Sequence, residues 1–214
     1  MEHYDEKILK ARCAAAQEKI NEAEKEDLEM EQQESIMDAC VHIEGKEVCF
    51  SRRVIEEMGI SIYMPESFEQ MDDEMKAAVY PFGNPPQKVY ADLGIPFQIT
   101  LKNTGSAVPD EGIPKFMQIS AKVLENFGPK SKILANGVIR HHDHNIGIME
   151  AGTRAMDCNV HNVMFDISIH DQIVMGNIHF ATRYSKRMIP IAKQMIDSIE
   201  FLEGNDGNDN ISQS

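Results

Sequence analysis

The stretch "KILANGVIRHHDHNIGIMEAGTRAMDCNVHNVMFDISIHDQIVMGNIHFATR", residues 132–183, decides the fold. Apolar and polar residues alternate along most of it, and this alternation is typical of strands that bury one face. Short polar stretches interrupt the pattern and predict turns. The sequence therefore predicts an antiparallel meander of four strands, at roughly 132–142, 145–156, 159–170 and 172–183.

The register of this meander sorts its residues onto two faces, because cross-strand partners share a face. The tight turns are predicted at Asp143-His144, Asp157-Cys158 and Asp171-Gln172. One face is then mostly apolar and predicts a core covered by a helix, with Ile139, Ile148, Val163, Phe165, Ile167, Ile178 and Phe180. Glu150 and His161 fall on the same face, which indicates either exposure at the edge or a slip in the register.

The opposite face mixes methionine with polar groups. Its candidate binding residues are Arg140, Met149, Met164, Asp166, Ser168, Met175 and His179, with Asn177 beside them. Methionine side chains adapt their shape, and a few polar groups among apolar ones are typical of ligand or partner surfaces. The alternative is a second layer of helix on this face, with a contact between Arg140 and Asp166 that satisfies both groups.

The remaining segments surround the meander with helices and shorter strands. Helices are predicted at 66–81, 110–128 and 185–202, strands at 59–65, 87–93 and 96–104, and a hairpin at 41–50 that turns at Gly45-Lys46. This order predicts the α+β class. We expect an antiparallel sheet with a C-terminal four-stranded meander covered by helices, which is an α/β/α sandwich.

Two acidic segments flank this domain. Residues 5–38 contain neither Gly nor Pro, and their apolar residues follow a weak heptad pattern. We therefore predict a helical arm over residues 1–40, ahead of an α+β domain at 41–202. The arm is either a coiled-coil or docking element, open to self-association through this helix, or an amphipathic helix that lies on its own domain. Residues 203–214 predict a disordered acidic tail.

The formal net charge of −14 limits the partners. Nucleic acids and anionic membranes attract basic surfaces, so the sequence argues against both. Much of the excess charge is terminal, because residues 1–37 carry 11 acidic and 5 basic residues, and residues 200–214 add four acidic residues and no basic one. Solvated ends explain this charge without an acidic binding surface. No run approaches the ~18 apolar residues of a membrane span.

Four cysteines, Cys13, Cys40, Cys49 and Cys158, form no CxxC motif. A chain of this length does not need disulfide cross-links to fold, so we predict free thiols in a reducing compartment. The first residues, "MEHYDEKILKARC", show no apolar signal core. The sequence therefore predicts a cytoplasmic location.

The segment "RHHDHN", residues 140–145, holds three of the eight histidines. In the predicted register, His142 and His170 share one face near one end of the sheet, about 9–10 Å apart across two strand spacings. A zinc ion would need His144 to lean in from the turn, and an aspartate to supply the fourth ligand. We therefore predict a hydrated hairpin end that binds no metal, and no cofactor for the chain.

Two functional hypotheses follow. No GxSxG, P-loop, HExxH or GxGxxG motif is present, so no catalytic residue is predicted. The first hypothesis is a non-enzymatic binding or assembly module of unknown partner. The alternative is a small-molecule or metal-dependent enzyme that uses the polar face of the meander, with Arg140, Asp166 and His179 in one pocket.

Short phrases outside the meander are similar to those of a known superfamily. A strand ends in Met64-Pro65, "ESFEQM" follows at 66–71, a helix closes in "VYP" at 79–81, and Asn84-Pro85-Pro86 precedes the next strand. With a final helix ending in "IDSIEF", this order resembles the PsbP/DcrB-like α/β/α sandwich superfamily over about residues 59–202. The resemblance implies a non-catalytic binding or assembly protein with a protein partner. Members are often secreted or lipid-anchored, and this chain departs from them in its long arm and in lacking an export signal.

Overall fold

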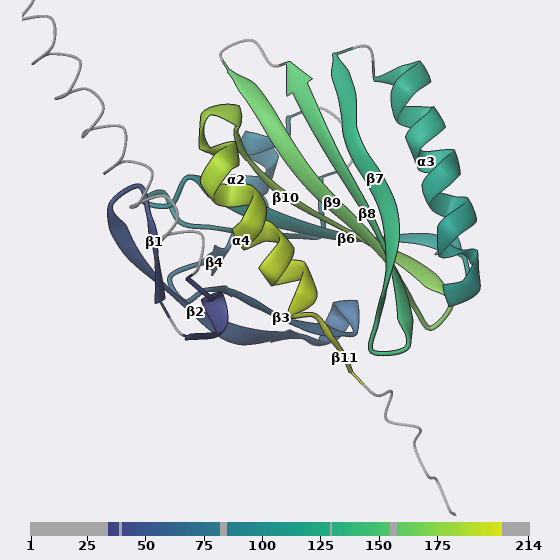
Figure 1. The fold of residues 1–214 in the computed structure, drawn as a ribbon, viewed down its shortest axis with the longest axis horizontal. Coiled ribbons are helices and arrows are strands. Elements are labelled where there is room, and N and C mark those ends of the chain that lie inside the picture. The colour runs from purple at the N-terminus through teal and green to yellow at the C-terminus, as the bar shows by residue number, and fades with distance from the viewer. Residues whose placement is uncertain (1–33, 39, 82–84, 129, 155–157, 203–214) are drawn as a thin grey trace, which may run out of the picture.

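The computed structural model describes residues 34–38, 40–81, 85–128, 130–154 and 158–202. Its largest element is an antiparallel seven-stranded sheet in the order β4-β5-β6-β10-β9-β8-β7 (Figure 1). The strands are β4 (Glu69–Gln70), β5 (Lys88–Ala91), β6 (Phe97–Ala107), β7 (Ser131–His141), β8 (His144–Arg154), β9 (Asn159–Ile169) and β10 (Gln172–Ala181). The last four form the predicted meander, which is confirmed.

A second, four-stranded sheet has the order β1-β2-β3-β11. Its strands are β1 (Cys40–Ile43), β2 (Lys46–Ile55), β3 (Ile60–Pro65) and β11 (Glu200–Phe201). The first two form the predicted hairpin, but its turn is Glu44-Gly45, with φ of 51° and 72°, one residue earlier than predicted. Strand β11 brings the C-terminal end of the domain back to β3.

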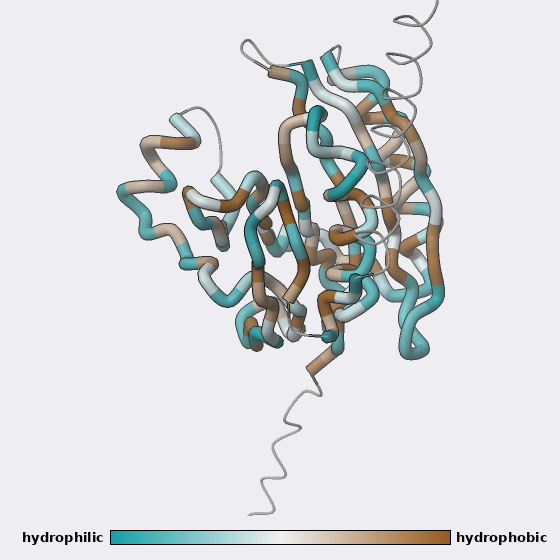
Figure 2. Tube along the Cα trace, turned by 60° about the vertical axis from the view of Figure 1, so that its left-hand side comes forward, coloured by the Kyte–Doolittle hydropathy of each residue, from teal (hydrophilic) through white to brown (hydrophobic). Residues whose placement is uncertain are grey.

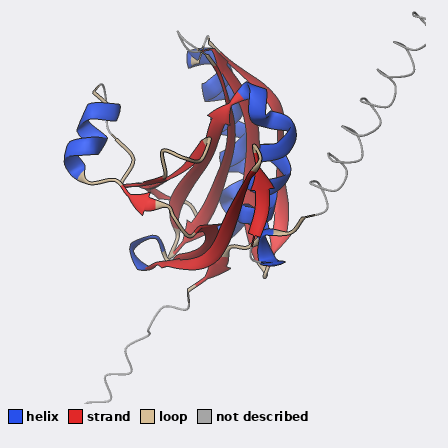
Figure 3. Ribbon diagram, turned by 90° about the vertical axis from the view of Figure 1, so that its left-hand side faces the viewer, coloured by secondary structure: helices blue, strands red, loops and turns tan. Residues whose placement is uncertain are grey.

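Helices cover both faces of the large sheet, which confirms the predicted α+β class. The α-helices of the described residues are α2 (Asp73–Val79), α3 (Ile113–Phe127) and α4 (Ser185–Asp197), and the 3-10 turns are η1 (Ile36–Asp38), η2 (Glu56–Met58), η3 (Asp110–Gly112) and η4 (Thr182–Tyr184). Helix α3 packs on β7 and β8, whereas α4 lies on the other face between the two sheets (Figure 1). Helix α2 stands apart at the β4 margin (Figure 3).

Two helices are shorter than predicted. The helix expected at 66–81 begins only at Asp73, because the Asp72 carboxylate accepts a hydrogen bond from the backbone N–H of Met75 and caps the helix there. The residues before it form a turn and β4. The helix expected at 185–202 ends at Asp197, and residues 200–201 form β11 because they pair with β3.

Apolar and polar residues alternate along the strands (Figure 2). The apolar side chains build two cores. The larger core lies between α4, the small sheet and one face of the large sheet, and it contains the predicted Val163, Phe165, Ile167, Ile178 and Phe180. The smaller core lies under α3 and contains Ile113, Met117, Ala121, Met149 and Ile173. We call these two sides of the large sheet the α4 face and the α3 face.

The meander turns lie one residue earlier than predicted. His142-Asp143 and His170-Asp171 form the two-residue turns, and His141 pairs with His144. The pairing therefore differs from the predicted one by two residues along each partner strand, which leaves every side chain on its predicted face. Glu150 and His161 do lie on the α4 face, and Nε2 of His161 is 3.6 Å from a Glu150 carboxylate oxygen that faces it.

The described end of the predicted arm packs on the domain. Ile36 is 0% exposed and belongs to the larger core. The Glu34 carboxylate accepts hydrogen bonds from the His42 backbone at 2.8 Å and from the guanidinium of Arg187. Residues 1–33 and the predicted tail at 203–214 lie outside the described residues, so the helix and the disorder expected there stay predictions.

The prediction of free thiols is wrong for two cysteines. Cys40 and Cys49 form a disulfide across β1 and β2, because the Glu44-Gly45 turn places them directly opposite each other. Cys158 is a free, exposed thiol, and Cys13 lies outside the described residues. No helix among the described residues is long and apolar enough to cross a membrane.

Candidate functional site

The predicted binding face is largely covered by α3. Met149 is buried in the core beneath this helix, and Met164 and Met175 pack against the same core. The Ser168 hydroxyl donates a hydrogen bond to the backbone carbonyl of Val108 at 2.7 Å. The three methionines therefore lie in or against the core under α3, as the helix-layer alternative predicted, and Ser168 binds the segment that precedes this helix. A binding role for these four residues stays a prediction.

The charged residues of this face do not meet. Arg140 contacts Asp110 at 3.4 Å, so the predicted contact between Arg140 and Asp166 does not form. Asp166 is 3% exposed, one of its carboxylate oxygens has no hydrogen-bond partner among the described residues, and burial raises its pKa to about 7. His179 contacts Gln98, and burial lowers the pKa of its imidazole to about 4. No common pocket of the described residues therefore joins Arg140, Asp166 and His179.

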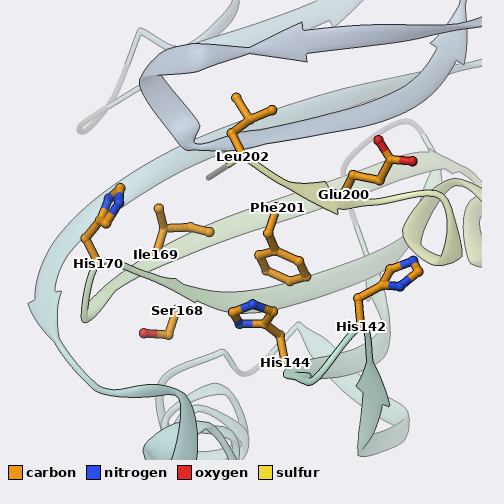
Figure 4. Close-up of a pocket in the computed structure, with 8 residues that line it drawn as sticks. All are labelled: His142, His144, Ser168, Ile169, His170, Glu200, Phe201 and Leu202. Carbon is orange, nitrogen blue, oxygen red and sulfur yellow. The ribbon is translucent and has the colours of Figure 1, made fainter. Parts of the chain in front are cut away.

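A pocket lies instead at the histidine end of the meander. It has a volume of about 620 Å³, within the range of ligand pockets, and is lined by His142, His144, Ser168, Ile169, His170, Glu200, Phe201 and Leu202 (Figure 4). We call it the histidine pocket. Ser168 is the one predicted binding residue that lines it.

Two hairpin turns with positive backbone φ angles place the histidines. Two-residue hairpin turns favour residues with positive φ, a region in which glycine and asparagine are common. Here His142, Asp143, His170 and Asp171 take φ of 45°, 63°, 49° and 59°. Aspartate and histidine are among the residues other than glycine that adopt such angles most often, so these turns suit the geometry of two-residue hairpins. Both turns lie at the same end of the sheet and present a histidine to the same pocket.

Strand β11 supplies the apolar side of the pocket. The His144 ring stacks on the Phe201 ring, with centroids 3.9 Å apart and planes 23° from parallel. Figure 4 shows this pair at the centre, with His142 and His170 on either side. His141, just outside the pocket, lies 2.9 Å through Nε2 from the backbone carbonyl of Ile199 and ties the β7 end to the segment before β11.

Asp110 fixes the turn from the other side. Its carboxylate accepts hydrogen bonds from the backbone N–H and the side-chain amide of Asn145, both at 2.8 Å. It also lies 3.7 Å from Nδ1 of His144. The η3 turn therefore orients the histidine that stacks on Phe201, and the pocket is held from both sheets.

The pocket suits an apolar or aromatic group with polar neighbours. Ile169, Phe201 and Leu202 offer apolar contact, and the imidazoles and Glu200 offer donors and acceptors around it. The described residues contain no group of three or more His, Cys, Asp or Glu side chains placed to hold a metal ion. The absence of a metal and of a cofactor stays a prediction.

The part of the histidine pocket that β11 forms was not predicted from the sequence. The helix predicted at 185–202 includes Glu200, Phe201 and Leu202, although Ile199 and Phe201 flank Glu200 in the period-two pattern of a strand. Without β11, the histidines were expected to form a hydrated rim. The structure places an aromatic ring among them.

Comparison with solved structures identifies the fold. The chain is similar to cyanobacterial PsbP (CyanoP) from Synechocystis sp. PCC 6803, at 11% identity over 71% of this chain and 92% of that chain, with a TM-score of 0.54. A protein of unknown function, PA94 from Pseudomonas aeruginosa, matches at 11% identity over 70% and 94% of the two chains, with a TM-score of 0.41. The immunity protein TplEi of the same organism, complexed with an "L" peptide, matches at 9% identity over 71% and 78%, with a TM-score of 0.36.

The likeness to CyanoP shows a PsbP-like fold, and the expected resemblance is confirmed at that level. The other two likenesses are too weak to carry an argument. No family model matches the sequence, and no curated protein matches it significantly.

Proposed function

We propose that this chain, which has a PsbP-like fold, is a non-enzymatic binding or assembly module whose histidine pocket receives a protein partner. One observation carries the proposal: two hairpin turns, each with a histidine, and a separate strand converge on one pocket with an apolar side. Apolar pockets rimmed by polar groups are typical recognition sites. An aromatic or aliphatic side chain of the partner fits the space beside Phe201.

The enzyme alternative has less support. It required Arg140, Asp166 and His179 to line one pocket. Arg140 contacts Asp110, His179 contacts Gln98, and Asp166 is buried with one carboxylate oxygen that has no hydrogen-bond partner among the described residues. None of the three lines the histidine pocket.

Site-specific cross-linking tests the proposal. A photoreactive phenylalanine analogue at position 170 reports on the pocket, and the same analogue at the exposed position 122 on α3 is the control. In cells of the natural source, we expect one protein adduct from position 170 and none from position 122. The adduct should fall when His144→Ala removes the ring stacked on Phe201. An adduct of equal yield at both positions, or one that His144→Ala leaves unchanged, would contradict the proposal.

The Cys40–Cys49 disulfide bears on location. Disulfides persist in oxidising compartments and are rare in the cytosol, which supports an oxidising compartment over the predicted cytoplasm. Alkylation of the protein isolated without reductant tests this. We expect label on Cys158 and none on Cys40 or Cys49. Label on all three would restore the cytoplasmic prediction.

Self-association through the N-terminal helix remains part of the proposal. The heptad pattern of residues 5–38 supports it, and sedimentation velocity measures it. We expect a larger species for the full chain than for a variant beginning at Glu34, which keeps Ile36 in the core. Equal sizes would contradict self-association through the arm.

A further inference from the structure

The four edges of the two sheets differ in length. Strands β4 and β11 have two residues each, and β1 has four and is joined to β2 by a disulfide. Strand β7 has 11 residues, and no described strand pairs with its outer side. A long open edge presents a row of unpaired N–H and C=O groups, which is a template for strand addition.

The geometry of β7 is regular over its second half. A bulge interrupts the pairing between Ile133 and Ala135, but from Ala135 to His141 each residue pairs with one residue of β8. The two-residue turn makes His141 and His144 a hydrogen-bonded pair. By alternation along the strand, the amides of Asn136, Val138 and Arg140 then point to the open edge. This stretch has no proline, so all three donors are available.

Apolar side chains lie exposed beside this edge. Leu134 is 52% exposed and Ile139 is 37% exposed. Ile139 lies on the α4 face, where α4 packs over β9 and β10 and leaves β7 uncovered (Figure 1). An added strand would therefore gain apolar contact as well as backbone hydrogen bonds.

The edge is basic, although the chain carries −14. Lys130, Lys132 and Arg140 are exposed along it, and β7 contains no acidic residue. Among the described residues, the two lysines form no ion pair, and Arg140 has only its 3.4 Å contact with Asp110. A second copy of β7 added along this edge would bring the basic residues of two copies close together, and like charges near one another are unfavourable. The charges therefore favour a partner other than a second copy.

We propose that the open edge of β7 binds an extended, acidic segment of a partner protein by antiparallel or parallel strand addition. This surface is separate from the histidine pocket and does not depend on the function proposed for it. The backbone supplies the binding of an extended chain, and the basic residues select acidic sequences.

The probe is a fluorescent peptide of alternating glutamate and valine, as long as the regular part of β7. A peptide with lysine in place of glutamate is its control. We expect saturable binding of the acidic peptide in fluorescence anisotropy and none of the basic one. Hydrogen exchange should slow at the amides of Asn136, Val138 and Arg140. No binding up to about 1 mM peptide would overturn the proposal.

Two variants at Asn136 distinguish the contribution of its backbone N–H to peptide binding from that of its side chain. Asn136→Pro removes the outward N–H, and Asn136→Ala keeps it. We expect Asn136→Pro to weaken binding by at least about tenfold and Asn136→Ala to leave it nearly unchanged. Equal affinity of the two variants would contradict strand addition.

If the Asn136→Pro variant does not fold, charge-reversal variants test the same proposal. Lys132→Glu with Arg140→Glu should abolish acidic-peptide binding, whereas Lys115→Glu with Lys122→Glu makes the same charge change on α3 and should not. A concentration-dependent dimer that the β7 charge change alters would assign the edge to a second copy and overturn the acidic partner. His144→Ala should leave peptide binding intact, so failure here and failure of the histidine pocket are distinguishable.

Discussion

The two faces of the large sheet are built from the same strands but differ in what they bury. The α4 face is closed by fully buried apolar side chains such as Phe165, Ile167 and Ile178. The α3 face packs methionines under one helix and also encloses polar atoms of Asp166 and His179 that have no hydrogen-bond partner among the described residues, whereas the α4 face encloses one such atom, Nε2 of His161. The comparison indicates that the α4 face supplies most of the stability, while the α3 face carries the two groups with the largest pKa shifts, Asp166 and His179.

Truncation of one large side chain on each face tests this contrast most strongly. Phe165→Ala empties a site in the larger core, and we expect it to lower the free energy of unfolding by about 3–5 kcal/mol. Met149→Ala should cost about 2 kcal/mol, because α3 can settle onto the smaller side chain. Urea unfolding measures both values. Equal losses would show that the two faces contribute alike.

Alanine substitution at one glycine on each face compares how tightly the two faces are packed. A Cβ at Gly176 would run into the ring of Phe165, and one at Gly147 would run into the thioether of Met117. A packed aromatic ring cannot yield as a flexible methionine can. We expect Gly176→Ala to destabilise by about 2–3 kcal/mol and Gly147→Ala by less than about 1 kcal/mol. Thermal melts of the two variants check this, and a larger cost at Gly147 would mean that the α3 face is the stiffer one.

The division into faces could be predicted from the sequence, although the turns were placed one residue late. A pairing error of two residues keeps each side chain on its side of the sheet, so Phe165 and Met149 were assigned correctly. At the first hairpin, the same one-residue error in the position of the turn changes which residue is predicted to lie opposite Cys40. A turn at Gly45-Lys46 pairs Cys40 with Ser51, and only the observed turn at Glu44-Gly45 places Cys40 opposite Cys49.

The histidine pocket could not be predicted because it joins distant segments. His142 and His170 were expected at one end of the sheet, and both line the pocket. Phe201 comes from the other sheet through its pairing with Ile60, a contact that local periodicity does not encode. The position of Asp110 under the same turn also depends on the packing of η3 against β8.

The pH dependence of the free energy of unfolding tests the contribution of Asp166, the buried carboxyl group of the α3 face. Asp166 has a pKa of about 7 in the folded protein because of burial, against about 3.9 in an unfolded chain. Between these values, the folded protein holds a proton that the unfolded chain has lost, so the contribution of Asp166 to stability falls as the pH rises from about 4 to about 7. We expect Asp166→Asn to match the natural protein near pH ~4 and to exceed its free energy of unfolding by about 2 kcal/mol near pH ~8. Urea unfolding across this range measures the difference, and a variant less stable at high pH would contradict the account.

His179 should produce the smallest effect, with the opposite sign. Burial lowers the pKa of its imidazole to about 4 in the folded protein, against about 6.5 in the unfolded chain. The unfolded chain therefore binds a proton first, and the stability contributed by neutral His179 is lost as the pH falls from about 6.5 to about 4.

The pH range in which His179 changes the stability overlaps the range for Asp166. The two effects have opposite signs, so they partly cancel in the natural protein. His179→Gln removes one of them while keeping a polar group beside Gln98. We expect the variant to gain about 1 kcal/mol relative to the natural protein between pH ~7 and pH ~4. The same comparison in the Asp166→Asn background, where the opposing slope is gone, should give the same gain. A gain that appears only in the presence of Asp166 would mean that the two groups are coupled across β9 and β10, and that the α3 face titrates as one unit.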